Sequence, residues 1–259
     1  RGGCSWRLAG SGLQRQSCPM KAAHAKPRRL EDILFSQGFG TRRVCAGLIQ
    51  QGHVKLNGET VQDAGAQLAP GLLCLQKGER LLDACAAPGG KTAHLLETIR
   101  SEPGELIALE IDTERTKKIV NTLTRLQLIN SRIQVITGDA SQPNWWDGNL
   151  FDKILLDVPC SASGIVRRHP DIVFLRKQQD IVRLVETQRA ILENVWMMLK
   201  NGGTLLYLTC SIFPEEGEEQ ITRFVRDHPN ALRLEAPGQL LPSEHHDGFF
   251  YGLLKKHQP

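Results

Sequence analysis

The sequence predicts an α/β fold in which helices cover both faces of a doubly wound parallel sheet, preceded by a small α+β module. From about residue 80, short apolar runs alternate with stretches whose apolar residues have helical spacing. Such alternation is typical of βαβ units, which build parallel sheets. The charge changes near residue 60: residues 1–60 carry ten Lys/Arg and three Asp/Glu, a net charge of +7, whereas the whole chain is at +4. We therefore predict a boundary there.

Composition excludes several classes of protein. The 259 residues are 41% apolar and 23% charged, which is ordinary for a globular protein and argues against a largely disordered chain. No apolar stretch approaches the ~20 residues that cross a bilayer, and the N-terminus lacks the apolar core of a secretory signal. The seven cysteines include no CxxC pair, so we expect free thiols, no metal site and a cytoplasmic location. We also expect a monomer.

The predicted sheet contains five strands, each a short apolar run. Two of the intervening helices are marked by apolar residues at helical spacing, around Ile119–Leu126 and Ile181–Leu199. We found no internal repeat. The strands are expected at 80–84, 105–111, 132–137, 151–158 and 203–209.

The N-terminal part divides into two segments. Residues 1–28 are irregular and basic, and we expect them to be disordered; Met20 could be a start, which leaves open whether residues 1–19 belong to the native protein. Residues 29–60 predict two short helices separated by Gly38 and Gly40, then a pair of strands around an Asn-Gly turn. Residues 61–259 form the expected main domain.

Polar residues follow every predicted strand of the main domain. In a parallel sheet the carboxyl ends of the strands meet at one edge, where such folds bind ligands. We therefore expect one site built from five segments of the chain. They are DACAAPGGKT (83–92), Glu110 with Asp112, Gly138-Asp139, DVPCSASG (157–164) and Thr209-Cys210-Ser211.

The segment 83–92 is rich in glycine and runs into a helix, so it can cradle a nucleotide. It misses the P-loop pattern because Cys85 stands where the first glycine is required, and it is not GxGxxG. Glu110, with Asp112 as the alternative, can accept hydrogen bonds from a ribose, and Asp139 can receive an adenine amino group. An adenosine ligand without phosphates fits this set, which points to S-adenosylmethionine.

Cys160 and Cys210 should both face the same crevice, because each lies at a strand end. A pyrimidine is a poor nucleophile at carbon 5, but a thiolate that adds to carbon 6 places electron density on carbon 5, which can then accept a methyl group. One cysteine would attack, and a second group would remove the carbon 5 proton. The other cysteines of the main domain, Cys74 and Cys85, are interpreted as inert small apolar residues, as is Cys45.

Four segments of the main domain resemble the bacterial Sun/Fmu family of rRNA cytosine-carbon-5 methyltransferases, which have a Rossmann-like sheet. They are DACAAPGGKT, LLDVPCSASGIVRRHPDI, LYLTCSIFPEE and DGFFYGLLKK, and VQDAGAQLAPGLL is similar to the segment that precedes that family's core. The resemblance implies S-adenosylmethionine as cofactor and RNA, in particular rRNA, as substrate. It also implies Cys210 as the nucleophile, with Cys160 assisting proton removal and release. DNA cytosine methyltransferases use the cysteine of the PC motif instead, and the TC motif here argues against that assignment.

The same resemblance implies a cofactor-binding set, in which Asp157 contacts cofactor or base and is included among the catalytic residues. Glu110 stands where the family usually has Asp. The family also usually carries a helical RNA-binding domain and a further subdomain before the core, and neither is found here. The implied cofactor-binding residues are Cys85, Ala86, Ala87, Pro88, Gly89, Gly90, Lys91, Glu110, Asp139 and Asp157.

Residues 29–60 resemble a small RNA-binding module shared by a small-subunit ribosomal protein and rRNA pseudouridine synthases. The resemblance implies that Thr41, Arg42, Arg43 and Lys55 face phosphates, and a generic basic hairpin is the alternative. Arg167 and Arg168, beside the PC motif, are further candidate RNA contacts, whereas Trp145 and Trp146 are expected to pack on the sheet edge, and His245 and His246 to lie on the surface.

Two other functions remain open at this point. The chain could be an RNA-binding protein whose methyltransferase core is inactive because the family's usual subdomains are missing. It could also be a nucleotide hydrolase that uses 83–92 as an aberrant P-loop.

Overall fold

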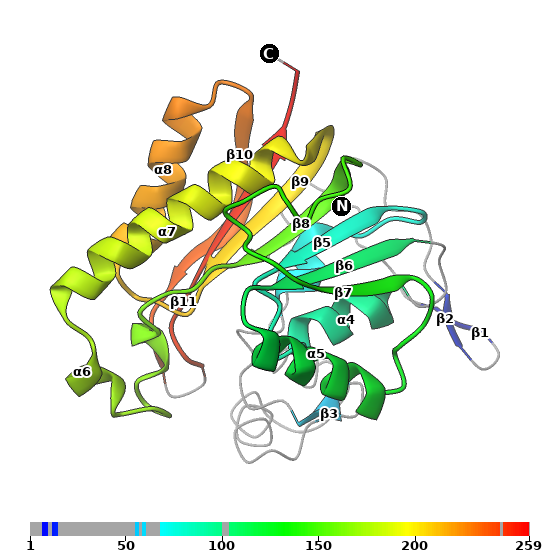
Figure 1. Ribbon diagram of the computed structural model, residues 1–259, viewed down its shortest axis with the longest axis horizontal. Helices are drawn as coiled ribbons and strands as arrows, with labels where there is room; N and C mark the ends of the chain where they lie inside the picture. The colour runs from blue at the N-terminus through cyan, green and yellow to red at the C-terminus, as the bar shows by residue number, and fades with distance from the viewer. Residues whose placement is uncertain are drawn as a thin grey trace.

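The computed structural model describes residues 68–99, 104–243 and 246–258, together with the backbone of four short strands nearer the N-terminus. The main domain is built on a seven-stranded sheet with the order β10-β11-β9-β8-β5-β6-β7 (Figure 1). Among the described helices, none combines the length and the apolar character needed to cross a membrane.

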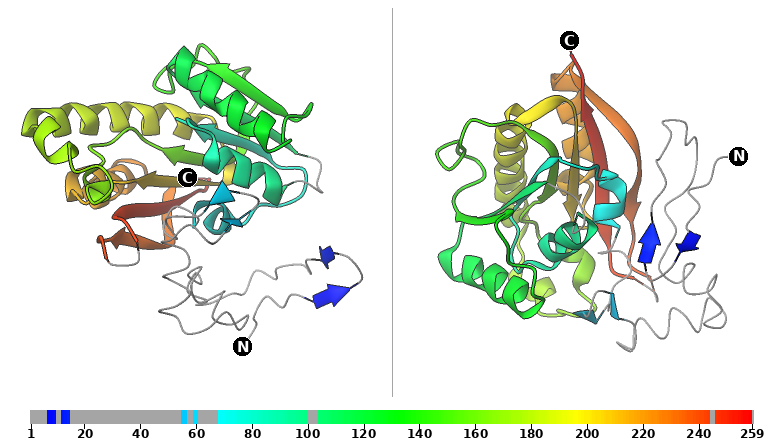
Figure 2. Two further views of the ribbon diagram at one scale, coloured as in Figure 1. Left: turned by 90° about the horizontal axis from the view of Figure 1, so that it is seen from below. Right: turned by 90° about the vertical axis from the view of Figure 1, so that its right-hand side faces the viewer.

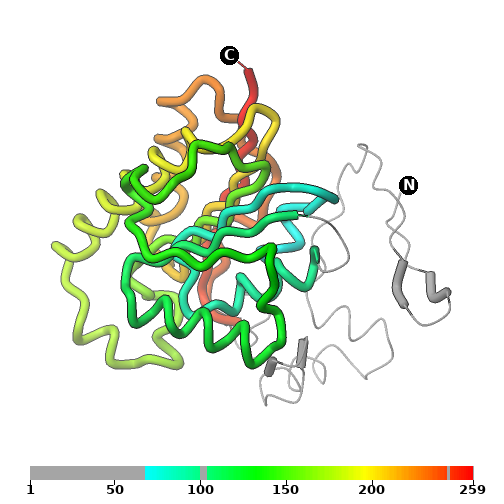
Figure 3. The backbone as a smooth tube through the Cα atoms, turned by 45° about the vertical axis from the view of Figure 1, so that its right-hand side comes forward, coloured from blue at the N-terminus to red at the C-terminus, as the bar shows by residue number. Residues whose placement is uncertain are grey.

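Five strands of this sheet are parallel, as the alternating pattern predicts. They are β5 (Arg80–Ala84), β6 (Glu105–Glu110), β7 (Ile133–Thr137), β8 (Phe151–Asp157) and β9 (Leu199–Thr209). The fifth strand begins earlier than the expected 203–209, because Leu199 already pairs with Phe151 ahead of a register shift. The chain thus runs outwards from β5 through β6 to β7, and then resumes on the other side of β5 with β8 and β9 (Figure 3).

The expectation of a wholly parallel sheet is wrong at the C-terminal end. Strand β11 (Phe249–Lys256) lies between β9 and β10 (Ala231–Leu240) and is antiparallel to both. The cause is the connection: β10 and β11 follow one another without an intervening helix, so the chain must reverse. Figure 2 (right) shows these two strands, orange and red, side by side.

Helices cover both faces of the sheet, as predicted. Helices α3 (Ala69–Leu73), α4 (Gly90–Thr98) and α5 (Thr113–Arg125) pack on one face, and α7 (Gln178–Met197) and α8 (Glu218–Asp227) pack on the other. Neighbouring strand residues alternate between the two cores: Leu81 belongs to the first and Leu82 to the second. The remaining elements are the short helix α6 (Ile172–Leu175) and the 3-10 turns η2 (Ser163–Ile165) and η3 (Pro214–Glu216).

The structure describes four short strands nearer the N-terminus, and one pair of them confirms a prediction. Strands β3 (Lys55–Leu56) and β4 (Glu59–Thr60) pair antiparallel around the expected turn. Within residues 1–28, the strands β1 (Arg7–Ala9) and β2 (Gly12–Gln14) pair antiparallel, and the rest of this segment, expected to be disordered, lies outside the described residues. Thr41, Arg42 and Arg43 lie outside the described residues, and the side chain of Lys55 is not described.

The topology fixes where a ligand can bind. Strand order reverses between β5 and β8, which are hydrogen-bonded neighbours although β6 and β7 intervene in the chain. In open α/β sheets the loops after two such strands diverge to opposite faces and leave a crevice outside their carboxyl ends. The loops that begin at Cys85 and Val158 therefore border the expected site.

Candidate functional site

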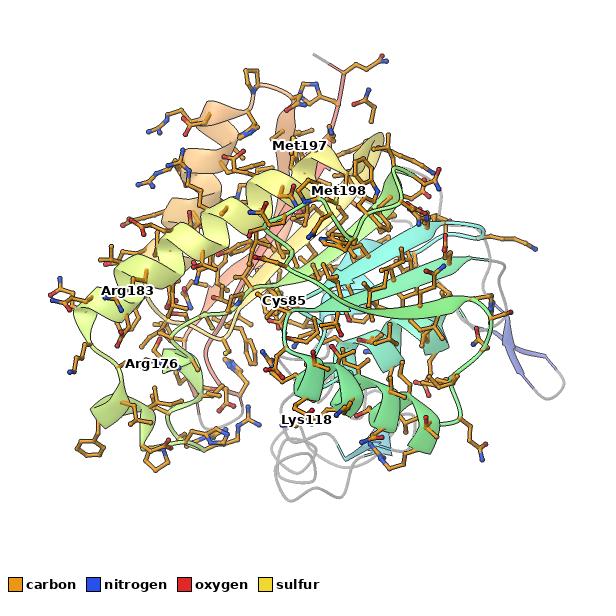
Figure 4. The ribbon with its side chains drawn as sticks, in the orientation of Figure 1. Cys85, Lys118, Arg176, Arg183, Met197 and Met198 are labelled. Atoms are coloured by element: carbon orange, nitrogen blue, oxygen red, sulfur yellow. The ribbon has the colours of Figure 1, made fainter. Side chains whose placement is uncertain are left out.

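The loop after β5 contains the predicted cofactor-binding run, Cys85, Ala86, Ala87, Pro88, Gly89, Gly90 and Lys91. Cys85 (φ 62°) and Gly89 (φ 101°) both adopt the left-handed conformation. A Cβ on Gly89 would lie 3.1 Å from the Cα of Ile119 in α5, so a larger residue would push the loop away from that helix. Helix α4 begins at Gly90 without a side-chain cap, so no capping side chain accepts a hydrogen bond from its first N–H groups. Figure 4 labels Cys85 near the centre of the molecule.

Asp83 lies at the end of β5 and is fully buried. Its Oδ2 accepts a hydrogen bond of 2.6 Å from Thr92 Oγ1, while Oδ1 has no hydrogen-bond partner among the described residues. Burial is the main reason that the pKa of Asp83 is raised to about 7. Asp83 is the first residue of the segment DACAAPGGKT, but nothing in the sequence indicated a role for its side chain. A buried carboxylate oxygen without a partner is a candidate acceptor for a ligand.

Glu110, the predicted ribose acceptor, ends β6 and is 1% exposed. Its carboxylate accepts long hydrogen bonds from Ala87 N (3.2 Å) and Asp112 N (3.4 Å), and lies 3.3 Å from Arg115 Nη1. Asp112, the alternative acceptor, instead caps α5 by accepting from Arg115 N. Arg115, which sequence reasoning missed, also donates to Ala87 O and so joins β6 to the loop after β5.

Asp139, predicted to face adenine, follows β7 at the same edge of the sheet. Its Oδ1 accepts hydrogen bonds from the backbone N and the hydroxyl of Ser141. Trp145 donates its indole N–H to Asp139 O, and Trp145 and Trp146 both pack against the core. The prediction that the two tryptophans pack on the sheet is confirmed, and Trp145 holds the Asp139 loop in place.

Lys91 and Asp157 connect the loop after β5 with the end of β8. Lys91 Nζ lies 2.7 Å from Asp157 Oδ2, and both side chains are about one quarter exposed, at 24% and 27%. Burial disfavours the charge on Lys91, but the carboxylates of Asp157 and Asp83 outweigh it and raise the pKa of Lys91. Lys91 is therefore a fixed cation at the centre of the crevice.

Cys160 and Cys210 lie together, as predicted, with their Sγ atoms 3.3 Å apart. The hydrogen bond from Cys160 lowers the pKa of Cys210, and the nearby Lys91 acts in the same direction. That same hydrogen bond, together with burial, raises the pKa of Cys160. Because a thiolate is the reactive form of cysteine, these opposite shifts in pKa favour Cys210 over Cys160 as the nucleophile.

Cys85 and Cys74 are free thiols elsewhere in the described part of the chain. The pKa of Cys85 is raised mainly by burial and then by the carboxylates of Asp157 and Glu110, so it stays protonated. Cys74 is exposed at the end of α3. Among the described residues, no group of three His, Cys, Asp or Glu side chains is close enough to hold a metal ion.

Arg167 and Arg168, predicted to contact RNA, both pair with the buried Asp247. Their side chains remain 46% and 38% exposed, so they present positive charge to the solvent beside η2. His246 is half-buried, while His245 lies outside the described residues. Arg176, labelled in Figure 4 between α6 and α7, donates to Ser161 O, next to Cys160.

Comparison with known proteins gives two matching family models. The model described as 16S rRNA methyltransferase RsmB/F matches residues 70–255, and the model of the S4 domain matches residues 28–73. Ribosomal RNA small subunit methyltransferase B of Vibrio cholerae is 50% identical over 204 residues, which cover 76% of this chain and 46% of that protein. The corresponding protein of Sodalis glossinidius is 50% identical over 205 residues, with the same coverage. The chain thus spans about half the length of these relatives.

Solved structures agree with the sequence comparison. NSun6 from Pyrococcus horikoshii, solved with SFG, superposes with a TM-score of 0.68 at 28% identity and covers 77% of this chain and 53% of that one. A methyltransferase homolog protein, also from Pyrococcus horikoshii, gives a TM-score of 0.62 at 30% identity and covers 75% and 67%. These likenesses each cover about three quarters of this chain.

Proposed function

Because this chain belongs to the 16S rRNA methyltransferase RsmB/F family, whose model spans residues 70–255, we propose that it transfers a methyl group from S-adenosylmethionine to carbon 5 of a cytosine in small-subunit rRNA. The observation that carries the proposal is the 3.3 Å contact between the thiols of Cys160 and Cys210, which follow the ends of two adjacent strands. A thiolate at this place is what cytosine carbon 5 chemistry requires.

The residues around the loop after β5 fit S-adenosylmethionine. Asp83 Oδ1 is buried without a partner, and Glu110 makes only long hydrogen bonds, so both carboxylates can accept from a ligand. The uncapped start of α4 offers N–H donors for a carboxylate. SFG, found with the Pyrococcus NSun6, is an analogue of the same cofactor. When bound, S-adenosylmethionine supplies an electrophilic methyl group and becomes a neutral thioether.

Cys210 is the proposed nucleophile. Its thiolate forms a bond to carbon 6 of cytosine, and the electron pair of the 5,6 double bond becomes available at carbon 5, which accepts the methyl group. The proton on carbon 5 then leaves to a base, the double bond reforms, and the bond between carbon 6 and Cys210 breaks with its electron pair returning to sulfur. Lys91 favours the thiolate before attack and again after release.

Cys160 is the proposed group that assists proton removal. Before attack its proton is held by the hydrogen bond to the Cys210 thiolate. Once Cys210 is bonded to carbon 6 it no longer carries a negative charge, so the main cause that raises the pKa of Cys160 is gone. Cys160 can then lose its proton to water and accept the carbon 5 proton as a thiolate. Asp157 holds Lys91 beside this pair.

The proposed RNA contacts lie on two parts of the chain. The S4 domain at residues 28–73 includes Thr41, Arg42, Arg43 and Lys55, which we expect to face phosphates. Arg167 and Arg168, whose side chains are partly exposed beside η2, are the proposed phosphate contacts of the main domain. We place the protein in the cytoplasm, where rRNA is modified, and expect it to act as a monomer.

Labelled S-adenosylmethionine and a small-subunit rRNA transcript test the proposal directly. We expect labelled 5-methylcytosine in the transcript after incubation with the 259-residue chain, located by mapping the modified nucleotide. RNA binding without methyl transfer would instead support an RNA-binding protein with an inactive core. Binding of ATP, with no binding of S-adenosylmethionine, would support a nucleotide hydrolase.

A further inference from the structure

The two loops that carry Cys160 and Cys210 are joined by a buried cluster of hydroxyl groups beneath the thiols. Ser161 and Ser163 follow Cys160, and Ser211 follows Cys210. The Oγ of Ser211 lies 3.2 Å from that of Ser161 and 3.0 Å from that of Ser163. Ser161 and Ser211 are fully buried. The two loops therefore share one polar interior.

Glu216 is the charged member of this interior, and it is also fully buried. It ends η3, in the segment after Cys210, but its carboxylate binds the residue after Cys160. Oε1 accepts from Ser161 N at 2.8 Å, and Oε2 accepts from Ser161 Oγ at 2.5 Å. Gln188 in α7 donates to both Glu216 Oε1 (3.0 Å) and Pro159 O (2.9 Å). The Glu216 carboxylate thus holds the residue after Cys160 directly and the residue before it through Gln188.

The partners that fix the Glu216 carboxylate are all neutral donors. Burying a carboxylate without a cation is costly, and an amide would hold a loop at lower cost. The charge has a further effect, because it adds to the causes that raise the pKa of Cys160. Glu216 therefore holds the loop that carries this thiol, and its charge is a lesser cause of the raised pKa of Cys160.

The position of Cys160 depends more on side-chain contacts than the position of Cys210 does. Cys210 directly follows β9, whose end is hydrogen-bonded to a strand on each side, through Leu208 to β8 and Thr209 to β11. The ladder on the side of β8 ends at Asp157, and the last backbone bond before Cys160 is from Val158 N to Leu208 O. Beyond it, the loop is held by Glu216, Gln188 and Arg176.

We propose that Glu216 is a positioning residue that holds Cys160 against Cys210 for release of the methylated cytosine. This inference rests on the proposed methyl transfer and assigns Glu216 to its last stage. Formation of the bond to Cys210 needs the Cys210 thiolate, which Lys91 favours independently of Cys160, whereas proton removal and release need Cys160 in place. A defect at Glu216 should therefore delay release more than attack, and the protein should accumulate in covalent linkage with RNA.

A single-turnover experiment with the 259-residue chain, labelled S-adenosylmethionine and a small-subunit rRNA transcript separates the two stages. The covalent protein–RNA species is measured on a denaturing gel, and released 5-methylcytosine is measured in the RNA. The variants are Glu216→Gln, which removes the charge, and Ser161→Ala, which removes one hydroxyl and keeps the backbone bond. Glu218→Gln is the matched control, because Glu218 is half exposed and pairs with Arg233, away from both thiols.

We expect Glu216→Gln to form the covalent species at close to the wild-type rate and to release product at least about tenfold more slowly. This is less than the roughly 10²–10⁴-fold contribution of a proton-transfer group itself, because Glu216 acts only through Cys160. Ser161→Ala should show the same effect more weakly, and Glu218→Gln should match the wild type. Thermal unfolding of each variant gives the folded fraction. If Glu216→Gln does not fold, Ser161→Ala carries the test.

Two results would overturn the inference. One is release at the wild-type rate by Glu216→Gln or, if that variant does not fold, by Ser161→Ala. The other is an equal loss of covalent species and product, which is what a purely structural role would give. Failure of the proposed function looks different, since the wild-type chain would then produce neither covalent species nor 5-methylcytosine.

Discussion

The Sγ atom of Cys160 lies 3.3 Å from the Sγ atom of Cys210, although 50 residues separate the two cysteines in the chain. The contact arises because β8 and β9 are adjacent and parallel, so the residues that follow them meet at one edge of the sheet. The same contact gives the two thiols unequal acidity, since one sulfur donates the hydrogen bond and the other accepts it. Replacing Cys160 should therefore affect the reaction differently from replacing Cys210.

Cys210→Ala should abolish methyl transfer, because carbon 5 of the cytosine is then never activated. Cys160→Ala should allow the attack but stall release, leaving protein bound covalently to the transcript. A denaturing gel of each variant after incubation with cofactor and RNA distinguishes the two. If the covalent band appears with Cys210→Ala and not with Cys160→Ala, the roles of the two cysteines are reversed.

Alkylation of Cys210 should begin at lower pH than alkylation of an ordinary thiol. Its pKa is lowered by the hydrogen bond from Cys160, and only the thiolate reacts. Cys160→Ala removes that hydrogen bond and should shift the pH profile of iodoacetamide labelling upwards. Mass spectrometry follows Cys210, with the exposed Cys74 as a reference for the reagent in the same chain. Identical profiles for Cys210 in both proteins would contradict this assignment.

Because of Asp83, the free energy of unfolding of the protein should fall as the pH rises. Its pKa is raised from 3.8 to about 7 in the folded state, so between these values the folded chain keeps a proton that the unfolded chain has lost. At about 1.4 kcal/mol per pKa unit, the free energy of unfolding should fall by roughly 2–3 kcal/mol from pH 5 to pH 8 on this account. Asp83→Asn should remove that part of the slope in urea unfolding. An equal dependence of the free energy of unfolding on pH in the two proteins would show that folding does not raise the pKa of Asp83.

Gly89→Ala should destabilise the cofactor loop through a clash as well as through backbone strain. The residue has φ 101°, and an added Cβ would lie 3.1 Å from Ile119 Cα and 3.4 Å from Thr122 Cβ. Gly148→Ala is the matched control, because Gly148 has φ 85° and no atom within 4 Å of an added Cβ. Strain alone costs about 1–2 kcal/mol. Gly89→Ala should exceed the control and weaken binding of S-adenosylmethionine, which calorimetry measures; equal effects of both changes would remove the role of the α5 contact.

Replacing Arg42 and Arg43 together by Ala should weaken RNA binding and reduce its dependence on salt. Each cation that neutralises a phosphate releases counterions, so losing two of them should lower the slope of log affinity against log salt by about two. Filter binding of the transcript at several salt concentrations gives this slope. Binding of S-adenosylmethionine should be unchanged. An unaltered slope would mean that these arginines do not contact phosphates.

The sequence was sufficient for the parallel part of the sheet because apolar periodicity and turn chemistry are local. The runs that became β5 to β9 were placed to within a few residues, and the polar residues that follow them converge as expected. Strand β10 was not predicted. Its pairing with β11 shifts register between Leu234 and Gly238, so the sequence there does not follow the pattern of one continuous strand. The insertion of β11 between β9 and β10 is a long-range pairing, which no local pattern reports.

Within the site, sequence reasoning found the residues that have a chemical signature and missed those that act through position. Cys160, Cys210 and Lys91 stand in motifs whose chemistry can be read directly. Nothing in the run Pro214-Glu215-Glu216 indicates that the side chain of Glu216 lies in the interior, where it accepts a hydrogen bond from Ser161 of another loop. Arg115 is likewise an ordinary helix residue until the fold brings it to Ala87.

The reversed strand β11 has a consequence for synthesis of the chain on the ribosome. Strand β9, which leads into Cys210, obtains its second neighbour only from residues 249–256. A nascent or prematurely ended chain already contains both cysteines but lacks the strand that completes the sheet beside them. The order of translation therefore leaves one side of β9 unpaired until this last stretch of the sheet has emerged.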